Sequence, residues 1–324
     1  MKKLYASLLT GLLLAASTLA TQAQTIRRVN NSGVTGTNIY ATIQLAHDAA
    51  VAGDIIQVEP SSTGYGALTM SKNLTVVGPG YFLGLNTGLQ ANPLSATVDN
   101  IVFNSGSNGA SVSGLTLSGH VYIGASNVSF QRNYLPGYWI YLGYGAGTSN
   151  INLRQNYGSG IQNWGNTTNN VLITNNIFTS SLNLGTAASG EMVNNVLLST
   201  VNVDNFNVRN NYFAGTFQPN NNNYSFNISA QASFSTANNN QNNVPQASVF
   251  TLSPGSTQFD AWYQLKAGTN PARGTGSGGT DIGAFGGNTP YKLSGIPAIP
   301  SIYQFNQTLN GNTLNVNLST RSNN

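Results

Sequence analysis

The chain has no cysteine among its 324 residues. This absence excludes a disulfide scaffold, a zinc site with cysteine ligands and a thiol nucleophile. Charge is also scarce: Asp, Glu, Lys and Arg make up 6% of the chain, about a quarter of the share that is usual in soluble globular proteins. A highly charged, disordered chain is excluded too, because 40% of the residues are hydrophobic.

The few charges nearly cancel. Lys and Arg number 12 against 8 Asp and Glu, and two of the twelve, Lys2 and Lys3, lie at the N-terminus. Basic residues that are spread thinly along a chain do not form the stripe that follows a phosphate backbone. We therefore expect no nucleic-acid partner, despite the net charge of +4.

Residues 1–23 have the pattern of a secretory signal peptide. Lys2 and Lys3 precede an apolar run over residues 4–20, and small residues then offer cleavage sites after Ala23 or after Ala20. The alternative, a membrane anchor, is disfavoured because the run is short. We therefore expect an exported protein, secreted or at the cell surface, that has no membrane span.

One stretch, residues 41–52, has the periodicity of a helix. Its apolar residues recur at intervals of three and four and are expected to form one face: Ile43, Leu45, Ala46, Ala49 and Ala50. Gly53 follows, in a position where a left-handed residue commonly ends a helix. From there onward, short apolar runs such as residues 55–58 and 74–77 alternate with Asn, Gly, Ser and Thr, which favours strands.

The middle of the chain repeats at intervals near 20 residues. The repeated unit is a Gly or Asn followed by a large apolar residue, and it begins at Gly114, Asn133, Asn156, Asn176, Asn195 and Asn211. The intervals between these positions range from 16 to 23 residues. A second column, a large apolar residue followed by Gly, keeps step with the first and ends at Gly124, Gly143, Gly165 and Gly185. Two columns in step indicate a structural repeat.

A repeat of this length is typical of a parallel β-solenoid, in which each coil contains two or three short strands. Successive coils hydrogen-bond about 4.8 Å apart, and like side chains stack into ladders. Asn occupies 31 of the 140 positions from 104 to 243, so we expect the repeated Asn to form a ladder at a turn, without a ligand. The rival folds are a β-sandwich and a propeller, but neither requires Asn columns, and propeller repeats usually span about 40 residues or more.

The two ends of a solenoid require caps because their edge strands are unpaired. The predicted helix is well placed to cover the first coil, and we expect residues 281–285 to form the last coil strand. The solenoid domain would then span residues 24–290. Residues 291–324 are predicted to be a Pro-rich linker and a C-terminal β tail, in which residues 313–318 form a single strand that pairs along the solenoid or with a partner chain.

The N-terminal segments resemble the opening of right-handed parallel β-helix proteins of the pectin-lyase-like superfamily. The resemblance is carried by the helix, then Gly-Asp-Ile-Ile-Gln-Val at 53–58, Tyr65, and Lys-Asn-Leu-Thr-Val-Val-Gly at 72–78. Residues 80–83 and 281–285 are similar to secreted, uncharacterised members from Bacteroidetes-type bacteria. The resemblance covers about residues 25–324 and implies an all-β, right-handed parallel β-helix. It implies little about activity, because the superfamily includes lyases, hydrolases, adhesins and phage tailspikes.

Acidic residues are sparse for the enzymes of this superfamily. Its lyases use a calcium site of several carboxylates with a Lys or Arg base, and its glycosidases need two carboxylates about 5–9.5 Å apart. Between residues 100 and 259 the chain has only Glu191 and Asp204, which in the simpler interpretation cap turns. If the protein is an enzyme, Glu191, Asp204, Arg154 and Arg209 are the candidate catalytic residues. We expect no metal and no cofactor.

Three arginines lie next to the repeated asparagines. Arg154 and Arg209 each precede their Asn by two residues, so they are expected to share a column, separated by the two coils that carry Thr174 and Val193. Arg132 precedes its Asn by one. Each is either a solvated outward side chain or a residue that binds an acidic sugar or serves as a lyase base. The two histidines, His47 and His120, are expected in the capping helix and in a turn, too far apart to form a metal site.

Aromatic residues form the most informative candidate surface. Seven lie within 31 residues: Tyr134, Tyr138, Trp139, Tyr141, Tyr144, Tyr157 and Trp164. Each ring combines an apolar face with a polar tip, which suits sugar rings and protein surfaces alike. In the alternative interpretation most of these rings fill the core or cover its flank. The candidate ligand-binding residues are Tyr138, Trp139, Tyr141, Tyr144 and Trp164.

These patterns favour an exported, non-enzymatic protein that binds glycan or extracellular matrix, or that has a structural role at the cell surface. The alternative is a polysaccharide lyase or glycoside hydrolase with an unusual active site. A third hypothesis is a self-assembling solenoid whose tail strand pairs with its neighbours. The expected partner is thus a polysaccharide or a matrix component, and the oligomeric state is left open.

Overall fold

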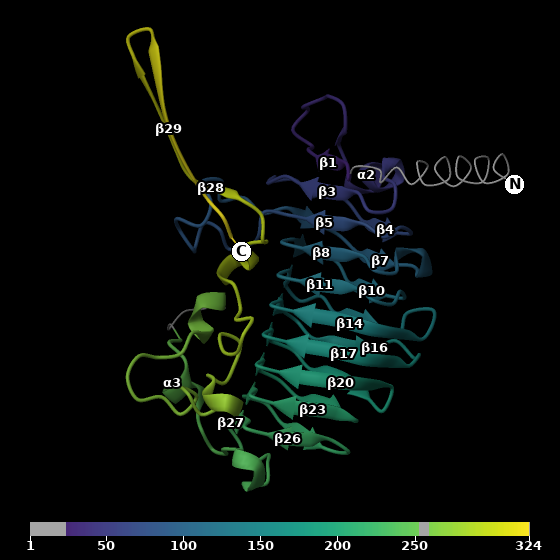
Figure 1. Cartoon of the computed structure of the whole chain (residues 1–324), viewed down its shortest axis with the longest axis vertical. Coiled ribbons are helices and arrows are strands. Elements are labelled where there is room, and N and C mark those ends of the chain that lie inside the picture. Colours follow the sequence, from purple (N-terminus) through teal and green to yellow (C-terminus); the bar gives the residue numbers. More distant parts are fainter. Residues whose placement is uncertain (1–23, 253–258, 324) are drawn as a thin grey trace, which may run out of the picture.

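The computed structural model describes residues 24–252 and 259–323. These residues wind into a right-handed parallel β-helix of about nine turns with roughly 20 residues each, as the sequence predicts (Figure 1). Three parallel sheets run along the solenoid, and a typical coil adds one strand to sheet A, then one to sheet C, then one to sheet B. The predicted signal peptide, residues 1–23, lies outside the described residues.

Sheet A has 11 strands. Along the solenoid these are β2 (Ile39–Tyr40), β1 (Ile26–Val29), β3 (Ile55–Val58), β5 (Thr75–Val77), β8 (Ser111–Ser113), β11 (Ser129–Gln131), β14 (Thr148–Arg154), β17 (Thr168–Thr174), β20 (Ala188–Val193), β23 (Phe206–Arg209) and β26 (Asn223–Ser225). Successive side chains of a strand point to opposite faces. Phe130, Leu153 and Ile173 pair in register and point inward, with no exposed surface.

Sheets B and C have 8 strands each. Sheet B consists of β4 (Leu68–Met70), β7 (Ile101–Phe103), β10 (Val121–Ile123), β13 (Ile140–Leu142), β16 (Ile161–Asn163), β19 (Leu182–Gly185), β22 (Val201–Val203) and β25 (Phe217–Pro219). Sheet C consists of β6 (Thr97–Val98), β9 (Thr116–Leu117), β12 (Tyr134–Leu135), β15 (Tyr157–Gly158), β18 (Ile177–Phe178), β21 (Val196–Leu197), β24 (Tyr212–Phe213) and β27 (Ile228–Ser229).

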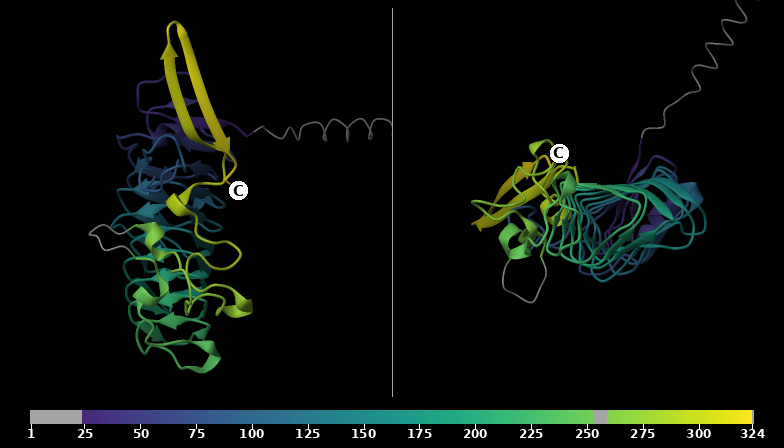
Figure 2. Two further views of the ribbon diagram at one scale, coloured as in Figure 1. Left: turned by 90° about the vertical axis from the view of Figure 1, so that its left-hand side faces the viewer. Right: turned by 90° about the horizontal axis from the view of Figure 1, so that it is seen from below.

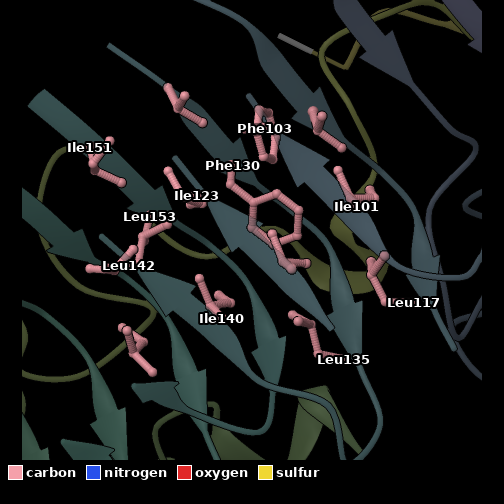
Figure 3. Packing of buried hydrophobic residues seen from close by; sticks show 14 of the residues in the cluster. Ile101, Phe103, Leu117, Ile123, Phe130, Leu135, Ile140, Leu142, Ile151 and Leu153 are labelled. Atoms are coloured by element: carbon pink, nitrogen blue, oxygen red, sulfur yellow. The ribbon is translucent and has the colours of Figure 1, made fainter. Parts of the chain in front are cut away.

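Ladders of apolar side chains fill the core between the sheets (Figure 3). Ile123 and Leu142 of sheet B, Phe130 and Leu153 of sheet A, and Leu135 of sheet C all belong to it. Burying one such side chain contributes about 1.5–3 kcal/mol relative to leaving it in water. Because the interior is packed in this way, a ligand has access to the outer faces of the sheets and to the turns.

The predicted Asn ladder lies at the turn from sheet A to sheet C and is buried. Its members are Asn133, Asn156, Asn176, Asn195, Asn211, Asn227 and Asn240. From Asn156 onward, each Oδ1 accepts hydrogen bonds from the Asn of the preceding coil: the backbone N–H of Asn176 lies 2.9 Å from Oδ1 of Asn195, and its Nδ2 lies 3.0 Å away. Gly114 is not in this column, because Leu115 donates to Asn133 instead.

The residue before each ladder position has a left-handed backbone. This column begins with Gly114 (φ 74°) and continues with Arg132, Gln155, Asn175, Asn194 and Asn210, whose φ values lie between 54° and 57°. Asn enters this region more readily than most residues because its short side chain can hydrogen-bond locally. The repeated Asn-Asn doublets thus combine two roles, since the first Asn makes the turn and the second joins the ladder.

The predicted N-terminal helix is confirmed but is shorter than residues 41–52. Helix α2 spans Ile43–Ala49, and the Oγ1 of Thr42 caps its first turn. At the other end, Lys72 Nζ donates at 2.8–2.9 Å to three carbonyl oxygens, those of His47, Asp48 and Ala50. A lysine from the next coil therefore satisfies the helix end, and Gly53 (φ 94°) lies farther on, in the turn that leads to β3.

Helix α2 covers the first coil with a narrower face than the periodicity suggests. Ile43, Ala46 and Ala50 are buried, as predicted. The prediction that Leu45 and Ala49 extend this face is wrong, because both are exposed. His47 is buried instead, and its Nε2 accepts a hydrogen bond from the backbone N–H of Ser71 at 3.1 Å. His47 therefore packs the cap against the coil below it.

Acid is expected to loosen the first coil through Asp54. This buried carboxylate accepts hydrogen bonds from the backbone N–H groups of Val51 and Thr25 and from Arg27 Nε, at 3.0, 3.1 and 2.8 Å. Burial opposes ionisation, but these hydrogen bonds and the charge of Arg27 prevail and hold the pKa of Asp54 below its ordinary value of 3.8. The stabilisation is therefore present above pH 3.8 and is lost as the pH falls through the folded-state pKa.

We expect the Asp54→Asn variant to lose about 2 kcal/mol of unfolding free energy at neutral pH, because the hydrogen bonds to a charged acceptor are lost. The difference from the unchanged protein should shrink at a pH well below 3.8, as the carboxylate of Asp54 takes up its proton. Urea denaturation at the two pH values measures this, with the exposed Asp99→Asn as the control. A difference that is independent of pH would contradict the assignment.

The prediction that residues 281–285 form a closing coil strand is wrong. The last strands are β26, β25 and β27, and after them the chain turns back along the outside of the solenoid (Figures 1 and 2). This returning region contains helix α3 (Gln246–Val249) and the 3-10 turns η3 (Asp260–Tyr263), η4 (Ser277–Gly279) and η5 (Leu293–Gly295). Residues 281–285 lie in it, and the backbone N–H of Gly283 donates to the carbonyl of Asn210.

Residues 277–296 form a strap that the left-handed column holds in place. The column's side chains hydrogen-bond to the strap, and the column positions fall in number as the strap positions rise. The pairs are Asn210 with 277 and 280, Asn194 with 281 and 283, Asn175 with 284 and 286, Gln155 with 289 and 290, and Arg132 with 296. Side-chain amides thus take the place of the strand pairing that was predicted here. The strap runs opposite to the direction of coil stacking and returns the chain to the N-terminal coils.

The returning region also covers the outer face of sheet C. Tyr157, Ile177, Val196, Tyr212 and Ile228 point outward from this sheet into a second apolar cluster, which they share with Phe250, Ile282, Ala284 and Tyr291. Sheet C is therefore apolar on both faces. This explains why a large apolar residue follows each repeated Asn in the sequence.

A buried carboxylate joins three distant segments beneath the strap. Asp260 has no exposed surface and accepts hydrogen bonds from Asn86 Nδ2 (3.1 Å), the Tyr291 hydroxyl (3.3 Å) and the Ser294 backbone N–H (2.7 Å). Tyr291 in turn hydrogen-bonds to the hydroxyl of Tyr81. Burial raises the pKa of Asp260 above its ordinary value, although its three donors favour the ionised form.

The C-terminal tail is a hairpin rather than the single strand predicted at residues 313–318. Strand β28 (Ser301–Asn310) pairs with the antiparallel strand β29 (Thr313–Arg321) across a turn that contains Gly311 (φ 59°). Strand β28 supplies the pairing for β29, because the hairpin leaves the solenoid surface. It projects past the first coils in Figure 1 and in the left view of Figure 2.

Candidate ligand-binding surface

The aromatic residues singled out in the sequence separate into two groups. Tyr157 is buried and Tyr134 is half-buried on sheet C, where both pack against Phe82 beneath the returning region. Burial raises the pKa of the Tyr157 hydroxyl well above its ordinary value. For Tyr134 and Tyr157 the structure therefore agrees with the alternative that the rings cover the flank of the core.

The other group forms a surface patch on the outer face of sheet B. Tyr122 and Tyr141 are paired in register on adjacent coils, and their rings stack with centroids 5.2 Å apart and an interplanar angle of 12°. The indole of Trp164 stands nearly perpendicular to both, 5.0 Å from Tyr141 and 5.5 Å from Tyr122. Tyr144 completes the patch, with its ring 5.0 Å from Tyr122. We call these four residues the aromatic patch.

Trp164 owes its exposure to a shift in the repeat. The sequence places Trp164-Gly165 in the same column as Leu142-Gly143, but in the structure Leu142 pairs with Asn163. Trp164 therefore follows the strand instead of pointing into the core, and half of its surface (50%) is exposed. An exposed Trp supported by neighbouring rings offers a flat apolar surface to a ligand.

Tyr138 and Trp139 lie at the edge of this region. Tyr138 contacts the ring of His120 with centroids 5.6 Å apart, and His120 in turn contacts Tyr141 at 5.4 Å. The backbone N–H of Trp139 donates to Nδ1 of His120 at 3.0 Å. The indole of Trp139 packs over Gly160, where an added Cβ would come within 2.9 Å of the ring. His120 thus positions the turn that carries both residues.

The sequence interpretation missed Tyr122 and His120 as members of this surface. Tyr122 lies one coil before Tyr141 and in the same register. The interval between them equals the repeat, so counting one repeat back from Tyr141 would have found it. Burial and the neighbouring tyrosines Tyr141 and Tyr144 raise the pKa of Tyr122, so its hydroxyl stays neutral at physiological pH.

The outer face of sheet B continues from the patch as a row of amides. The outward residues of successive strands are Thr69, Val102, Tyr122, Tyr141, Gln162, Asn183, Asn202 and Gln218. Asn202 Nδ2 donates to Asn183 Oδ1 at 3.1 Å, so these two amides are joined across adjacent coils. This column of the described residues carries no charge. Its side chains can pack against apolar surfaces and hydrogen-bond to hydroxyl groups.

Glu191 and Asp204 are not members of this outward column. Glu191 is on β20 of sheet A, where its carboxylate pairs with Arg209 at 3.0 Å. Asp204 is buried in the turn between β22 and β23, and its backbone N–H donates to the carbonyl of Gly185. In the sheet register Glu191 pairs with Asn207. Asp204 precedes Asn207 by three residues, so the two carboxylates are not paired. Within residues 24–252 and 259–323, no three His, Asp or Glu side chains form a group that could hold a metal ion.

Two of the three arginines occupy the predicted column on sheet A. Arg154 and Arg209 share one column, with Thr174 and Val193 between them. Arg154 hydrogen-bonds to Gln131 at 2.6 and 3.2 Å rather than to a carboxylate. The expectation of a solvated side chain or a sugar ligand is wrong for Arg132. It is buried, it binds the strap, and burial together with nearby Arg154 lowers its pKa.

Comparison with protein-family models and with curated proteins finds no match for this chain. None of the helices in the part of the chain that the structure describes is long and apolar enough to cross a membrane.

Proposed function

We propose that this protein binds a neutral polysaccharide along the outer face of sheet B and does not cleave it. The observation that carries the proposal is the uncharged column in which the stacked pair Tyr122 and Tyr141 continues into the amides of Gln162, Asn183 and Asn202. Aromatic faces pack against the apolar faces of sugar rings, and amides exchange hydrogen bonds with hydroxyl groups.

The absence of charge in this column favours a neutral ligand over an acidic one. An acidic polysaccharide would gain from nearby Arg or Lys, and the arginines of the solenoid middle lie on sheet A or under the strap. Cleavage would require a carboxylate that reaches the bound sugar, whereas Glu191 lies on sheet A and Asp204 is buried in the turn after β22. The distribution of side chains thus supports binding.

The proposal includes export and a place in the pectin-lyase-like superfamily. Both rest on the sequence: the signal-peptide pattern of residues 1–23, and the likeness of residues 53–58 and 72–78 to the opening of that superfamily's proteins. The parallel β-helix fold is compatible with this membership. An exported protein without cysteine would meet extracellular polysaccharide or matrix, which suits a binding role.

The test measures binding of residues 24–324 to soluble neutral and acidic polysaccharides by affinity electrophoresis. We expect retardation by a neutral polysaccharide, and a roughly tenfold weaker Kd, about 1.4 kcal/mol, for Trp164→Ala and for Tyr141→Ala. Leu172→Ala is the matched control, because Leu172 is an exposed apolar residue on sheet A.

Two results would contradict the proposal. One is retardation that is equally strong in the Trp164→Ala and Leu172→Ala variants. The other is the appearance of new reducing ends or unsaturated sugar products during incubation. In the second case Glu191→Gln and Arg209→Ala would be the first variants to assay, because these two side chains form the ion pair on sheet A.

A further inference from the structure

The hairpin of β28 and β29 has one apolar and one polar face. The register pairs Phe305 with Leu318 and Leu309 with Leu314, which places these side chains on one face. Together with Ile302 and Val316 they form the hairpin's apolar face, which we define as Ile302, Phe305, Leu309, Leu314, Val316 and Leu318. All six are exposed, Leu309 to 75%. Gln307, which pairs with Val316, is the polar residue in the middle of this face, and the opposite face carries Asn, Gln, Ser and Thr.

The described part of the chain leaves this hairpin without a packing partner. It is tied to the solenoid at its base, where Ile302 accepts a hydrogen bond from Ala91 and Arg321 donates to Leu89. The sheet has two strands, so both of its edges carry unpaired backbone groups. A two-stranded hairpin is only marginally stable in water unless another layer covers its apolar face.

The composition of the hairpin limits what that layer can be. Residues 301–320 contain no charged side chain. Solvent-exposed edge strands are normally protected by charged residues or proline, and this hairpin has neither between Ser301 and Thr320. A charged partner would gain no ion pair here. A neutral surface with an apolar face is complementary to a second copy of itself.

A groove at the base of the hairpin extends its apolar face. The groove has a volume of about 610 Å³, and its apolar lining includes Ile302, Phe305, Pro79 and Pro93. Polar residues line it as well, among them Glu59, whose carboxylate pairs with Arg28. Ile302 and Phe305 belong to both surfaces, so the two are continuous. If two hairpins pack face to face and antiparallel, the tip of each, with Leu309 and Leu314, reaches the base of the other.

We propose that two copies of this chain associate through their hairpins, apolar face against apolar face, with each tip in the groove of the other copy. The contact is isologous, because the same surface is used on both chains. Six exposed apolar side chains and the groove provide roughly 500–600 Å² per chain, which is near the lower limit for a specific interface. The association therefore depends on concentration.

The first experiment is sedimentation velocity of residues 24–324 over a hundredfold range of concentration. We expect a monomer–dimer equilibrium, and a roughly hundredfold weaker dimer for Leu309→Thr/Leu314→Thr, which removes both tip leucines. The control is Asn306→Thr/Asn315→Thr on the opposite face, which should dimerise as the unchanged chain does. Thr keeps a high strand propensity in both variants.

The second experiment uses the absence of cysteine in the chain. Val316 lies near the middle of the apolar face, so the Val316→Cys variant should form a disulfide-linked dimer on mild oxidation. The Asn315→Cys variant, which is changed on the opposite face, should not. A chain that stays monomeric at all concentrations would overturn the proposal, as would equal cross-linking of the two cysteine variants. Loss of polysaccharide binding on hairpin mutation, with no dimer in the unchanged chain, would assign the face to a glycan and also overturn it.

Discussion

Replacing Asn195 with alanine is expected to lower the free energy of unfolding by about 3–5 kcal/mol, a large part of a typical total. The side chain accepts hydrogen bonds from the backbone N–H and Nδ2 of Asn176 and donates to the carbonyl of Ile173 and to Oδ1 of Asn211. Alanine leaves these buried groups with fewer partners, and each buried group without a partner costs about 1–3 kcal/mol. The substitution also leaves a cavity.

Urea denaturation followed by circular dichroism measures this effect. Asn207→Ala is the matched control, because Asn207 is exposed on the outer face of the next coil, and we expect it to change stability by no more than about 0.5 kcal/mol. If Asn195→Ala unfolds during purification, Asn240→Ala at the end of the ladder provides a milder variant. Equal stability of Asn195→Ala and Asn207→Ala would show that the ladder does not hold the coils together.

Replacing Asp260 with alanine is expected to release the strap while the coils stay folded. The substitution removes the acceptor for Asn86, Tyr291 and the backbone of Ser294 in a site without exposed surface. Two or three buried donors without a partner cost about 3 kcal/mol or more. The open population of the strap should therefore rise roughly a hundredfold.

Hydrogen exchange read by mass spectrometry distinguishes this local release from global unfolding. Peptides from residues 277–296 should exchange roughly a hundredfold faster in Asp260→Ala, whereas peptides from β14 and β17 should keep their rates. Asp99→Ala, at an exposed position, should change neither set. Faster exchange throughout the coils would mean that the strap and the solenoid unfold as one unit, contrary to this prediction.

The pH dependence of the strap should be opposite to that of the first coil. Burial raises the pKa of Asp260, so the folded state binds this proton more tightly than the unfolded chain does. The pH-dependent part of its contribution to stability is thus greatest below the ordinary pKa of 3.8 and is lost as the pH rises through the folded-state pKa. The lowered pKa of Asp54 has the reverse effect at the other end of the solenoid.

The fold and its ladder could be predicted because both repeat locally. Each ladder asparagine meets the same surroundings one coil earlier, so the doublets at 175–176, 194–195 and 210–211 recur in the sequence itself. The errors arose where a coil departs from the average length. Gly114 and Trp164 each fall one residue out of register, and a shift of one residue moves a side chain to the other face of a strand.

The aromatic patch could be predicted only in part. The sequence showed the clustering of Tyr141, Tyr144 and Trp164 and the alternation that turns some rings inward. It did not separate the patch from Tyr134 and Tyr157, because the segment that covers sheet C comes about 100 residues later in the chain. Whether a ring on the outside of a coil meets solvent or another segment depends on that later packing.

The sequence by itself determined the β-helix, the Asn ladder, the capping helix and the column that Arg154 and Arg209 share. These features follow from residue spacing within and between neighbouring coils. Only the tertiary structure decided that residues 277–296 return as a strap, that Asp260 joins three segments, and that the tail projects as a hairpin. These features depend on contacts between residues far apart in the chain, and an irregular strap held by side-chain amides has no periodicity that a sequence could reveal.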